Sequence, residues 1–241
     1  MNDSMYRIER AKNALKEGKP ILIYDSDNRE GETDIVYPAT TITPADLFRL
    51  RSDGGGLICV AIHPDSADRL GLPFMVDVLQ VYSSYSNGGR GKNKFDTVTE
   101  KIGDIPYDRK SSFSIWVNHR ETFTGITDND RALTIRKLGE IVKRSMNGNG
   151  VNFGDEFRSP GHVAILRAAR GLVSERVGQT ELSIVMAIMA GITPSMAICE
   201  MLDHRTGKAL SKKDAIEYGR LNDMPFLEGS EIIDAYNRFK D

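Results

Sequence analysis

Residues 25–34 read Asp-Ser-Asp-Asn-Arg-Glu-Gly-Glu-Thr-Asp and lie between two short apolar runs, residues 21–24 and 35–37. Short runs of apolar, β-branched or aromatic residues bounded by polar clusters are typical of buried strands. The stretch therefore connects two strands and lies where they end. It holds five carboxylates and one guanidinium, that of Arg29. Like charges this close together repel one another unless a cation offsets them.

Two interpretations of this acidic stretch remain open on composition alone. It is either a solvated turn, as most charge runs are, or a site for a hard divalent cation and a polyhydroxylated substrate. Mg²⁺ takes one or two carboxylates and completes its shell with waters and substrate oxygens. A calcium-binding EF-hand is excluded, because that motif requires Asp or Asn at its fifth position and Gly at its sixth. The chain has Arg29 and Glu30 there.

The chain has 241 residues, of which 40% are hydrophobic, and a formal net charge of −2. This composition supplies one sizeable core and no global basic field, so we expect no nucleic-acid partner. The longest apolar run, residues 182–192, is too short to span a membrane. Residues 1–10 lack the apolar region of a signal peptide, which makes a cytoplasmic location the default expectation. The two cysteines, Cys59 and Cys199, have apolar neighbours and predict buried, reduced thiols.

Apolar periodicity divides the chain into strands and helices without an internal repeat. We predict strands over residues 21–24, 35–39, 57–62, 74–82, 112–117 and 195–200. We predict helices over residues 5–17, 44–51, 64–70, 128–144, 181–190, 211–221 and 230–239. Residues 83–94 are polar and glycine-rich, which predicts a loop. The irregular mixture predicts an α+β (complex α/β) fold, with residues 1–241 as a single domain whose mixed central sheet is flanked by helices.

Several other polar positions adjoin predicted strands and helices. Residues 122–131 open a helix with clustered threonines, and a helix N-terminus of this kind can hold an anion. His162 lies in a predicted Pro-Gly turn, and Glu200 ends an apolar strand. Thr180 is the predicted N-cap of the next helix, so Arg176 and Thr180 would flank a second positive helix end. Each position also has a purely structural interpretation as a cap or a turn.

Five separated motifs together resemble 3,4-dihydroxy-2-butanone 4-phosphate synthase of riboflavin biosynthesis over nearly the whole chain. They are Arg29-Glu30-x-Glu32-x-Asp34, Thr124-Gly125-Ile126-Thr127, Arg158-Ser159-Pro160-Gly161-His162-Val163, Arg176-x-Gly178-x-Thr180-Glu181 and Cys199-Glu200. Each motif alone is weak, but five in the right order are specific. The length resembles that of the stand-alone archaeal-type enzyme, without a fused GTP cyclohydrolase II.

The resemblance implies a lyase that converts D-ribulose 5-phosphate to L-3,4-dihydroxy-2-butanone 4-phosphate and formate. It also implies a Mg²⁺ cofactor, with Mn²⁺ as a substitute, and a homodimer whose active sites lie near the subunit interface. The first step is enolisation beside a carbonyl, which needs a base for the carbon acid and a Lewis acid for the developing oxyanion.

The resemblance also implies which residues form the site. Those implied for catalysis are Glu32, Asp34, His162, Glu200 and Cys59, and His162 would reach the neighbouring subunit's site. Those implied for substrate binding are Asp25, Arg29, Glu30, Asp34, Thr124, Thr127, Arg176, Val177, Gly178, Gln179 and Thr180. Glu30 and Gln179 occupy the positions of the protein ligands of the metal.

One departure from the family pattern affects the metal. Where the family has Gly-His-Thr-Glu, with the histidine as second metal ligand, the chain has Gly178-Gln179-Thr180-Glu181. An amide oxygen is a hard, neutral ligand, whereas imidazole suits Mn²⁺ well and Mg²⁺ acceptably. Three outcomes are open: Gln179 ligates through its oxygen, a water takes its place, or the protein binds metal poorly and turns over slowly.

Two alternatives belong to other classes of protein. A sugar-phosphate-binding protein of the same fold, with weak or no turnover, is favoured by Gln179. It is disfavoured by the acids and His162, which a protein without catalysis has no physical reason to keep together. A metal buffer built on the acidic stretch would bind Ca²⁺ or Mg²⁺ without any sugar phosphate. The lyase is the interpretation that accounts for all five motifs.

Overall fold

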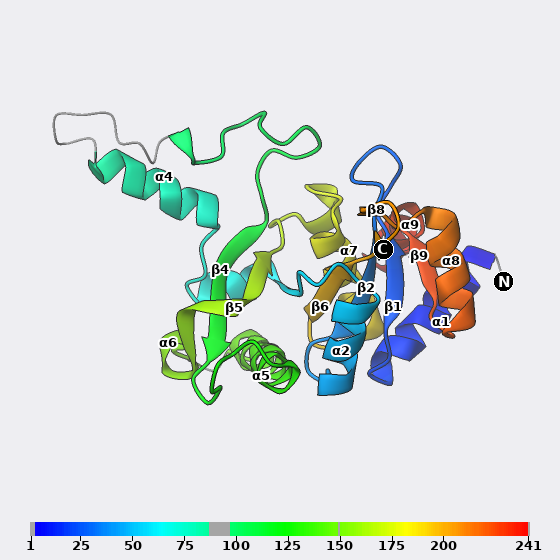
Figure 1. Cartoon of the computed structure of the whole chain (residues 1–241), viewed down its shortest axis with the longest axis horizontal. Coiled ribbons are helices and arrows are strands. Elements are labelled where there is room, and N and C mark those ends of the chain that lie inside the picture. Colours follow the sequence, from blue (N-terminus) through cyan, green and yellow to red (C-terminus); the bar gives the residue numbers. More distant parts are fainter. Residues whose placement is uncertain (1–2, 87–96, 149, 241) are drawn as a thin grey trace.

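A seven-stranded mixed sheet, with strand order β4-β5-β3-β6-β2-β1-β9, forms the centre of the molecule (Figure 1). The computed structural model describes residues 3–86, 97–148 and 150–240. The strands are β1 (Ile21–Tyr24), β2 (Thr33–Pro38), β3 (Cys59–Ile62), β4 (Phe113–His119), β5 (Phe157–Arg167), β6 (Ser195–Glu200) and β9 (Phe226–Glu228). Strand β3 is parallel to β5 and β1 is parallel to β9, whereas the other neighbours are antiparallel. The predicted mixed central sheet is confirmed.

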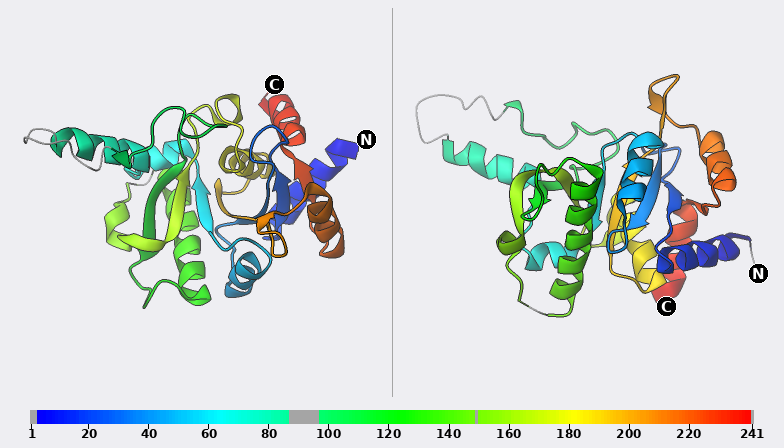
Figure 2. Two further views of the ribbon diagram at one scale, coloured as in Figure 1. Left: turned by 45° about the horizontal axis from the view of Figure 1, so that its top comes forward. Right: turned by 60° about the horizontal axis from the view of Figure 1, so that its bottom comes forward.

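Helices cover both faces of this sheet (Figure 2). They are α1 (Asp3–Lys16), α2 (Pro44–Ser52), α3 (Pro64–Arg69), α4 (Met75–Ser86), α5 (Asp128–Met146), α6 (Phe153–Glu156), α7 (Gln179–Ala190), α8 (Lys212–Leu221) and α9 (Gly229–Lys240). A short 3₁₀ turn, η2 (Leu172–Ser174), and a hairpin of β7 (Leu202–Asp203) and β8 (Lys208–Ala209) complete the described elements. None of the helices in the described part of the chain combines the length and the apolar character needed to cross a membrane.

The two faces of the sheet carry separate apolar cores. On one face, α1, α7 and α9 pack through residues such as Leu15, Val185 and Ile232. On the other face, α2 and α5 pack through residues such as Leu47 and Leu138. Every residue of β1 is buried, as expected for a central strand covered on both sides. The acidic stretch therefore extends from a rigid sheet.

The predicted strand over residues 74–82 is wrong, because all of this segment except Phe74 belongs to helix α4. Val76 is the one clearly buried apolar side chain of its first turns, while Val78, Val81 and Tyr82 are exposed. The loose alternation of apolar residues fits either period, and a helix satisfies its own backbone without a partner strand. Helix α4 projects from the body of the molecule (Figures 1 and 2). It includes the first residues of the predicted loop over 83–94, and the part from residue 87 lies outside the described residues.

Two further predictions need correction. Residues 158–162 are not a separate turn but the first part of strand β5, although they leave its ladder. The pairing with β4 moves from Val117↔Val163 to Asn118↔Arg158, so residues 159–162 have no described partner residue in β4. Thr180 is not an N-cap, because α7 begins earlier, with Gly178 as its N-cap and no side-chain cap. Strand β9 had no sequence prediction, because three residues after a proline give no periodicity.

Candidate active site

The buried Asp25 side chain holds the loop between β1 and β2 in one conformation. Its buried carboxylate accepts hydrogen bonds from the backbone N–H groups of Glu30 and Glu32, each at 3.0 Å. It also lies 3.3 Å from the Arg29 guanidinium. A carboxylate that accepts backbone N–H groups fixes a turn in one conformation. Asp25 therefore shapes the loop and does not line the cavity beside it.

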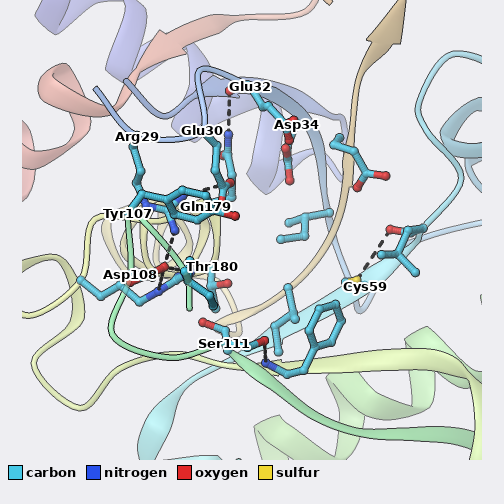
Figure 3. A pocket seen from close by; sticks show the side chains of 18 residues that line it. Arg29, Glu30, Glu32, Asp34, Cys59, Tyr107, Asp108, Ser111, Gln179 and Thr180 are labelled. Atoms are coloured by element: carbon cyan, nitrogen blue, oxygen red, sulfur yellow. Dashed lines mark hydrogen bonds and ion pairs between the residues drawn. The ribbon is translucent and has the colours of Figure 1, made fainter. Parts of the chain in front are cut away.

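A cavity of about 190 Å³ opens where this loop meets the ends of β3, β6 and β5, the start of α7 and residues 105–112 (Figure 3). Its lining includes the predicted site residues Arg29, Glu30, Glu32, Asp34, Cys59, Arg176, Gln179, Thr180 and Glu200. The sheet register explains how residues far apart in the sequence converge here. Asp34 is paired directly with Glu200 across β2 and β6, and Cys59 lies on the next strand.

The acids of the cavity oppose one another's ionisation. Burial, followed by repulsion from Glu200 and Glu30, raises the pKa of Asp34 well above its usual value. Burial, with Glu30 and Glu200 adding to it, raises the pKa of Glu32. Burial also raises the pKa of Glu200, and Glu30 contributes in the same direction. Directly paired like charges are destabilising across a sheet, so this cavity favours a bound cation or bound protons.

Two arginines face the acids and share one partner, Asp108. The Asp108 Oδ2 atom lies 2.6 Å from a guanidinium nitrogen of Arg29 and 2.6 Å from one of Arg176. Arg176 also binds the buried carboxylate of Glu181 at 2.6 Å. Although burial disfavours the charge of Arg29, the carboxylates of Glu30 and Asp108 raise its pKa. Both arginines are held in place beside the cavity by these carboxylates.

Gln179 is buried at the first position of α7 with its amide orientation fixed. Its Nε2 atom donates to the backbone carbonyls of Ile23 and Glu32, each at 3.0 Å. Its Oε1 atom is buried and has no hydrogen-bond partner among the described residues. An unpartnered buried acceptor costs about 1–3 kcal/mol. Because both amide protons are engaged, the oxygen is the atom of this amide that could still take a ligand.

Cys59 lines the cavity but is a poor nucleophile. Burial, with Glu200 and Asp34 adding to it, raises the pKa of the Cys59 thiol well above its usual value. Its Sγ atom contacts the carbonyl oxygen of Leu57 at 3.6 Å. The thiolate is the reactive form of cysteine, so this environment favours a packing role. Cys199, whose pKa burial raises to about 12, is likewise buried and reduced.

Three predicted site residues lie away from the cavity, at the opposite end of β4 and β5. Leu166 lines the cavity, and His162 precedes it by four positions, or roughly 13 Å along a strand. The hydroxyl of Thr127 caps α5 by accepting from the Asp130 N–H at 3.1 Å, and Thr124 bonds the Asp130 carboxylate. His162, Thr124 and Thr127 do not line the cavity of their own chain.

Val177 and Gly178 lie beside the cavity without lining it. Val177 packs against the core under α7. A side chain at Gly178 would overlap the guanidinium of Arg176 and crowd that of Arg29. Glycine at this position therefore lets both arginines approach the start of α7.

The sequence alone did not identify Tyr107 and Asp108. Both lie in residues 97–112, which show no helical or strand period, so only the folded chain brings them to the cavity. The Tyr107 ring lies 5.1 Å from the Arg29 guanidinium carbon, within the range of a cation–π contact. Aspartate in a segment without periodicity gives no signal, because most such residues are solvated.

Among the described residues no three His, Cys, Asp or Glu side chains form a ready metal-binding group. The cavity instead offers the half-buried carboxylate of Glu30, which lies 3.0 Å from the Arg29 guanidinium. It also offers Glu32, Asp34 and Glu200, and the Gln179 oxygen that has no partner among the described residues. Mg²⁺ is commonly bound by one or two protein ligands, with substrate and water completing the octahedron. The fold and the cavity thus indicate an enzyme whose cavity combines arginines suited to a small anion with oxygen donors suited to a hard cation.

Comparison with known proteins gives the family. The family model of 3,4-dihydroxy-2-butanone 4-phosphate synthase matches residues 9–235. A protein of that name from Methanosarcina mazei is 58% identical over 229 residues, covering 95% of this chain and 90% of the relative. Its counterpart from Archaeoglobus fulgidus is 55% identical over 233 residues, covering 97% and 95%. The chain belongs to the 3,4-dihydroxy-2-butanone 4-phosphate synthase family, and the prediction that it is an enzyme of this class, a lyase, is confirmed.

Solved structures agree with the fold. The crystal structure of the Candida albicans 3,4-dihydroxy-2-butanone 4-phosphate synthase is 26% identical, with a TM-score of 0.72 over 95% of this chain and 96% of that one. A synthase structure in complex with two magnesium ions is 24% identical, with a TM-score of 0.74 over 97% of each chain. At this identity the second match supports the arrangement of strands and helices alone.

Proposed function

We propose that the chain converts D-ribulose 5-phosphate to L-3,4-dihydroxy-2-butanone 4-phosphate and formate in the described cavity. The observation that carries the proposal is the meeting of Asp34 and Glu200 with two fixed arginines in one small cavity. Acids with raised pKa values are suited to removing a proton from carbon, since general bases work best near the operating pH. Arginines opposite them are suited to a phosphate.

A divalent cation is part of this proposal, with Mg²⁺ preferred and Mn²⁺ as a substitute. Glu30 and the Oε1 atom of Gln179 would hold it, because both residues line the cavity and carry hard oxygen donors. The Gln179 oxygen has no hydrogen-bond partner in the described part of the chain. A cation bound there would polarise the substrate carbonyl and stabilise the developing oxyanion. The magnesium named for the related solved structure is consistent with this choice.

Each remaining residue has a task that follows from its position. Arg176 and Thr180 lie at the start of α7, where charge-assisted bonds and the positive end of the helix suit the phosphate. Glu32, Asp34 and Glu200 would divide the proton transfers among them. A buried carboxylate can take up a proton from carbon and return it at an adjacent carbon without exchange with bulk water.

We further propose a homodimer in which each chain completes its partner's site. His162 and the turn at Thr124–Thr127 lie too far along β4 and β5 to serve their own cavity. This end of the molecule exposes Phe123 at 94% and Ile126 at 51%. Exposed apolar groups beside polar ones are typical of an interface. The cytoplasmic location expected from the sequence also remains part of this proposal.

The first experiment measures formate release from D-ribulose 5-phosphate by the purified protein with Mg²⁺, with Mn²⁺ and with EDTA. We expect metal-dependent formate. If no formate forms under any condition while ribulose 5-phosphate raises the melting temperature, the chain is a sugar-phosphate-binding protein instead. If Ca²⁺ or Mg²⁺ raises the melting temperature and ribulose 5-phosphate does not, the metal-buffer interpretation is correct instead.

A second experiment tests the shared site. Arg176→Ala removes a resident group, and His162→Gln removes the group supplied by the partner, so each homodimer should lose activity. Refolding the two variants together makes heterodimers that contain one intact site, and we expect up to about a quarter of the original activity. If the mixture stays as inactive as its components, His162 serves the cavity of its own chain or no cavity at all.

A further inference from the structure

Asn118, on β4, lies directly beneath His162 and makes two different contacts with it. Asn118 is fully buried, whereas His162 is exposed. The Asn118 Oδ1 atom accepts the backbone N–H of His162 at 2.8 Å. The Asn118 Nδ2 atom lies 3.1 Å from the imidazole Nδ1 atom. One amide side chain thus contacts both the backbone and the ring of the same histidine.

These two contacts together determine the tautomer of the ring. The backbone N–H can only donate, so the atom facing it must be the amide oxygen. The amide NH₂ group then faces the imidazole Nδ1 atom, and because NH₂ can only donate, Nδ1 must accept. The competing contact between Oδ1 and Nδ1 is longer, at 3.3 Å, and Oδ1 already has a donor. The ring proton of neutral His162 therefore lies on Nε2, the nitrogen that Asn118 does not contact.

Two glycines keep the Asn118 amide from moving. Gly125 has a φ of +90°, and a Cβ atom there would overlap the Asn118 amide. A Cβ atom at Gly161 would overlap the backbone between Val117 and Asn118. Gly125 belongs to the motif at residues 124–127, and Gly161 belongs to the motif at residues 158–163. Their absent side chains let two backbone segments pack flat against Asn118, which leaves the amide no room to turn over.

We propose that Asn118 is a positioning residue that fixes His162 with Nδ1 as acceptor and Nε2–H as an outward donor. This inference rests on the proposed function, in which His162 enters the partner's cavity. There the Nε2–H group would donate a hydrogen bond to an oxygen of the sugar phosphate. The opposite tautomer would present a lone pair to the same oxygen and would repel it. A tautomer that is fixed before the substrate binds is a form of preorganisation, because the ring needs no rearrangement during the reaction.

The decisive variant is Asn118→Asp, which keeps the shape of the side chain. One carboxylate oxygen still accepts the His162 N–H, but the other replaces a donor with an acceptor. The Nδ1 atom must then carry a proton, whether the ring is neutral or cationic. We expect ¹⁵N NMR of the imidazole, assigned by loss of the signal in His162→Gln, to show an unprotonated Nδ1 in the wild type and a protonated Nδ1 in the variant.

Kinetics supply the second readout. At a pH at which ¹⁵N NMR shows the variant ring to be neutral, Nε2 presents a lone pair in place of its proton. We then expect Asn118→Asp to lower kcat about 100-fold, as loss of one preorganised donor does, with little change in KM. The control is Asn13→Asp, which makes the same substitution at an exposed position of α1 and should change neither measurement. Gly125→Ala is the second variant, because it displaces the Asn118 amide from outside the core and should mix the two tautomers.

The results that would overturn the inference are distinct from failure of the proposed function. A wild-type His162 with its proton on Nδ1, or a tautomer unchanged in both Asn118→Asp and Gly125→Ala, refutes the geometry. A neutral ring with its proton switched to Nδ1 and an unchanged kcat refutes the positioning role. If the wild type releases no formate, the proposed function fails, while the NMR result still decides whether Asn118 sets the tautomer.

Discussion

Replacing Gln179 with methionine separates the two roles that the structure gives to this amide. Gln179→Met nearly conserves volume and keeps an unbranched side chain. It removes the two hydrogen bonds from Nε2 to the carbonyls of Ile23 and Glu32. It also removes the buried Oε1 atom, which has no partner among the described residues.

The two losses act in opposite directions on the free energy of unfolding. Two hydrogen bonds contribute about 1–3 kcal/mol together, at about 0.5–1.5 kcal/mol each. The unsatisfied oxygen costs about 1–3 kcal/mol in the metal-free protein, so its removal offsets most of that loss. The Glu32 carbonyl also keeps the backbone N–H of Asp25 as a partner, at 3.2 Å. Without metal, the change should therefore stay within about 2 kcal/mol.

The Mg²⁺-dependent part of the stability should fall more clearly. At a Mg²⁺ concentration of 100 times Kd, binding stabilises the native state by about 2.7 kcal/mol. If loss of the Gln179 oxygen weakens binding 10- to 100-fold, this increment falls to about 0.4–1.4 kcal/mol at the same concentration. The expected difference between wild type and variant is thus about 1.3–2.3 kcal/mol.

Urea unfolding followed by circular dichroism measures both effects, with EDTA and with Mg²⁺ at one fixed protein concentration. The control is Gln80→Met, which makes the same change at an exposed position of α4. If Mg²⁺ stabilises Gln179→Met as much as the wild type, the Oε1 atom is not a metal ligand. A water in its place, or a site built only on the acids, would then be the better account.

Three other substitutions test the remaining features of the cavity. Burial and neighbouring acids raise the pKa of Asp34 in the folded protein above its value in the unfolded chain. Protonation of Asp34 therefore stabilises the metal-free native state, and the free energy of unfolding falls as the pH rises through the folded pKa. Asp34→Asn should flatten this decline in denaturation midpoints measured in EDTA. Cys59→Ala should keep most of the formate-releasing activity. Native Cys59 should resist iodoacetamide at neutral pH, because burial raises the pKa of its thiol and the thiolate is the reactive form. Loss of turnover in a folded Cys59→Ala variant would contradict this expectation. Asp108→Asn should tighten inorganic phosphate binding several-fold, measured by calorimetry, because Asp108 competes with an anion for Arg29 and Arg176; weaker binding would show that it only orders them.

The sequence predicted those parts of the fold that depend on local pattern. The apolar runs around the acidic stretch, the capped helix at Thr43 and the long helix after Thr127 all form as expected. Helix α4 was not predictable from alternation, because its exposed valines fit a strand equally well. Whether such a segment forms a strand depends on whether a neighbouring strand has a free edge, and the sequence of the segment does not contain that information.

The site shows the same division between local and long-range information. The family motifs name the acids, but only the sheet register places Asp34 directly opposite Glu200. Gln179 was identified as a departure from the family pattern, and only the structure shows which of its amide atoms is free. Asp108 and Asn118 gave no signal in the sequence. Their importance comes from partners 68 and 44 positions away.

The charge balance of the cavity explains why a neutral amide is compatible with cation binding. Glu30, Glu32, Asp34 and Glu200 together carry more negative charge than one Mg²⁺ can neutralise. Burial and mutual repulsion raise the pKa values of Glu32, Asp34 and Glu200, so their ionised forms gain most from a cation. A cation that binds there favours the ionised carboxylates, so its affinity should rise with pH. A second protein ligand is therefore needed to fix the position of the cation more than to neutralise its charge. An amide whose nitrogen is fastened to two backbone carbonyls supplies a fixed oxygen, and unlike imidazole it cannot itself be protonated as the pH falls.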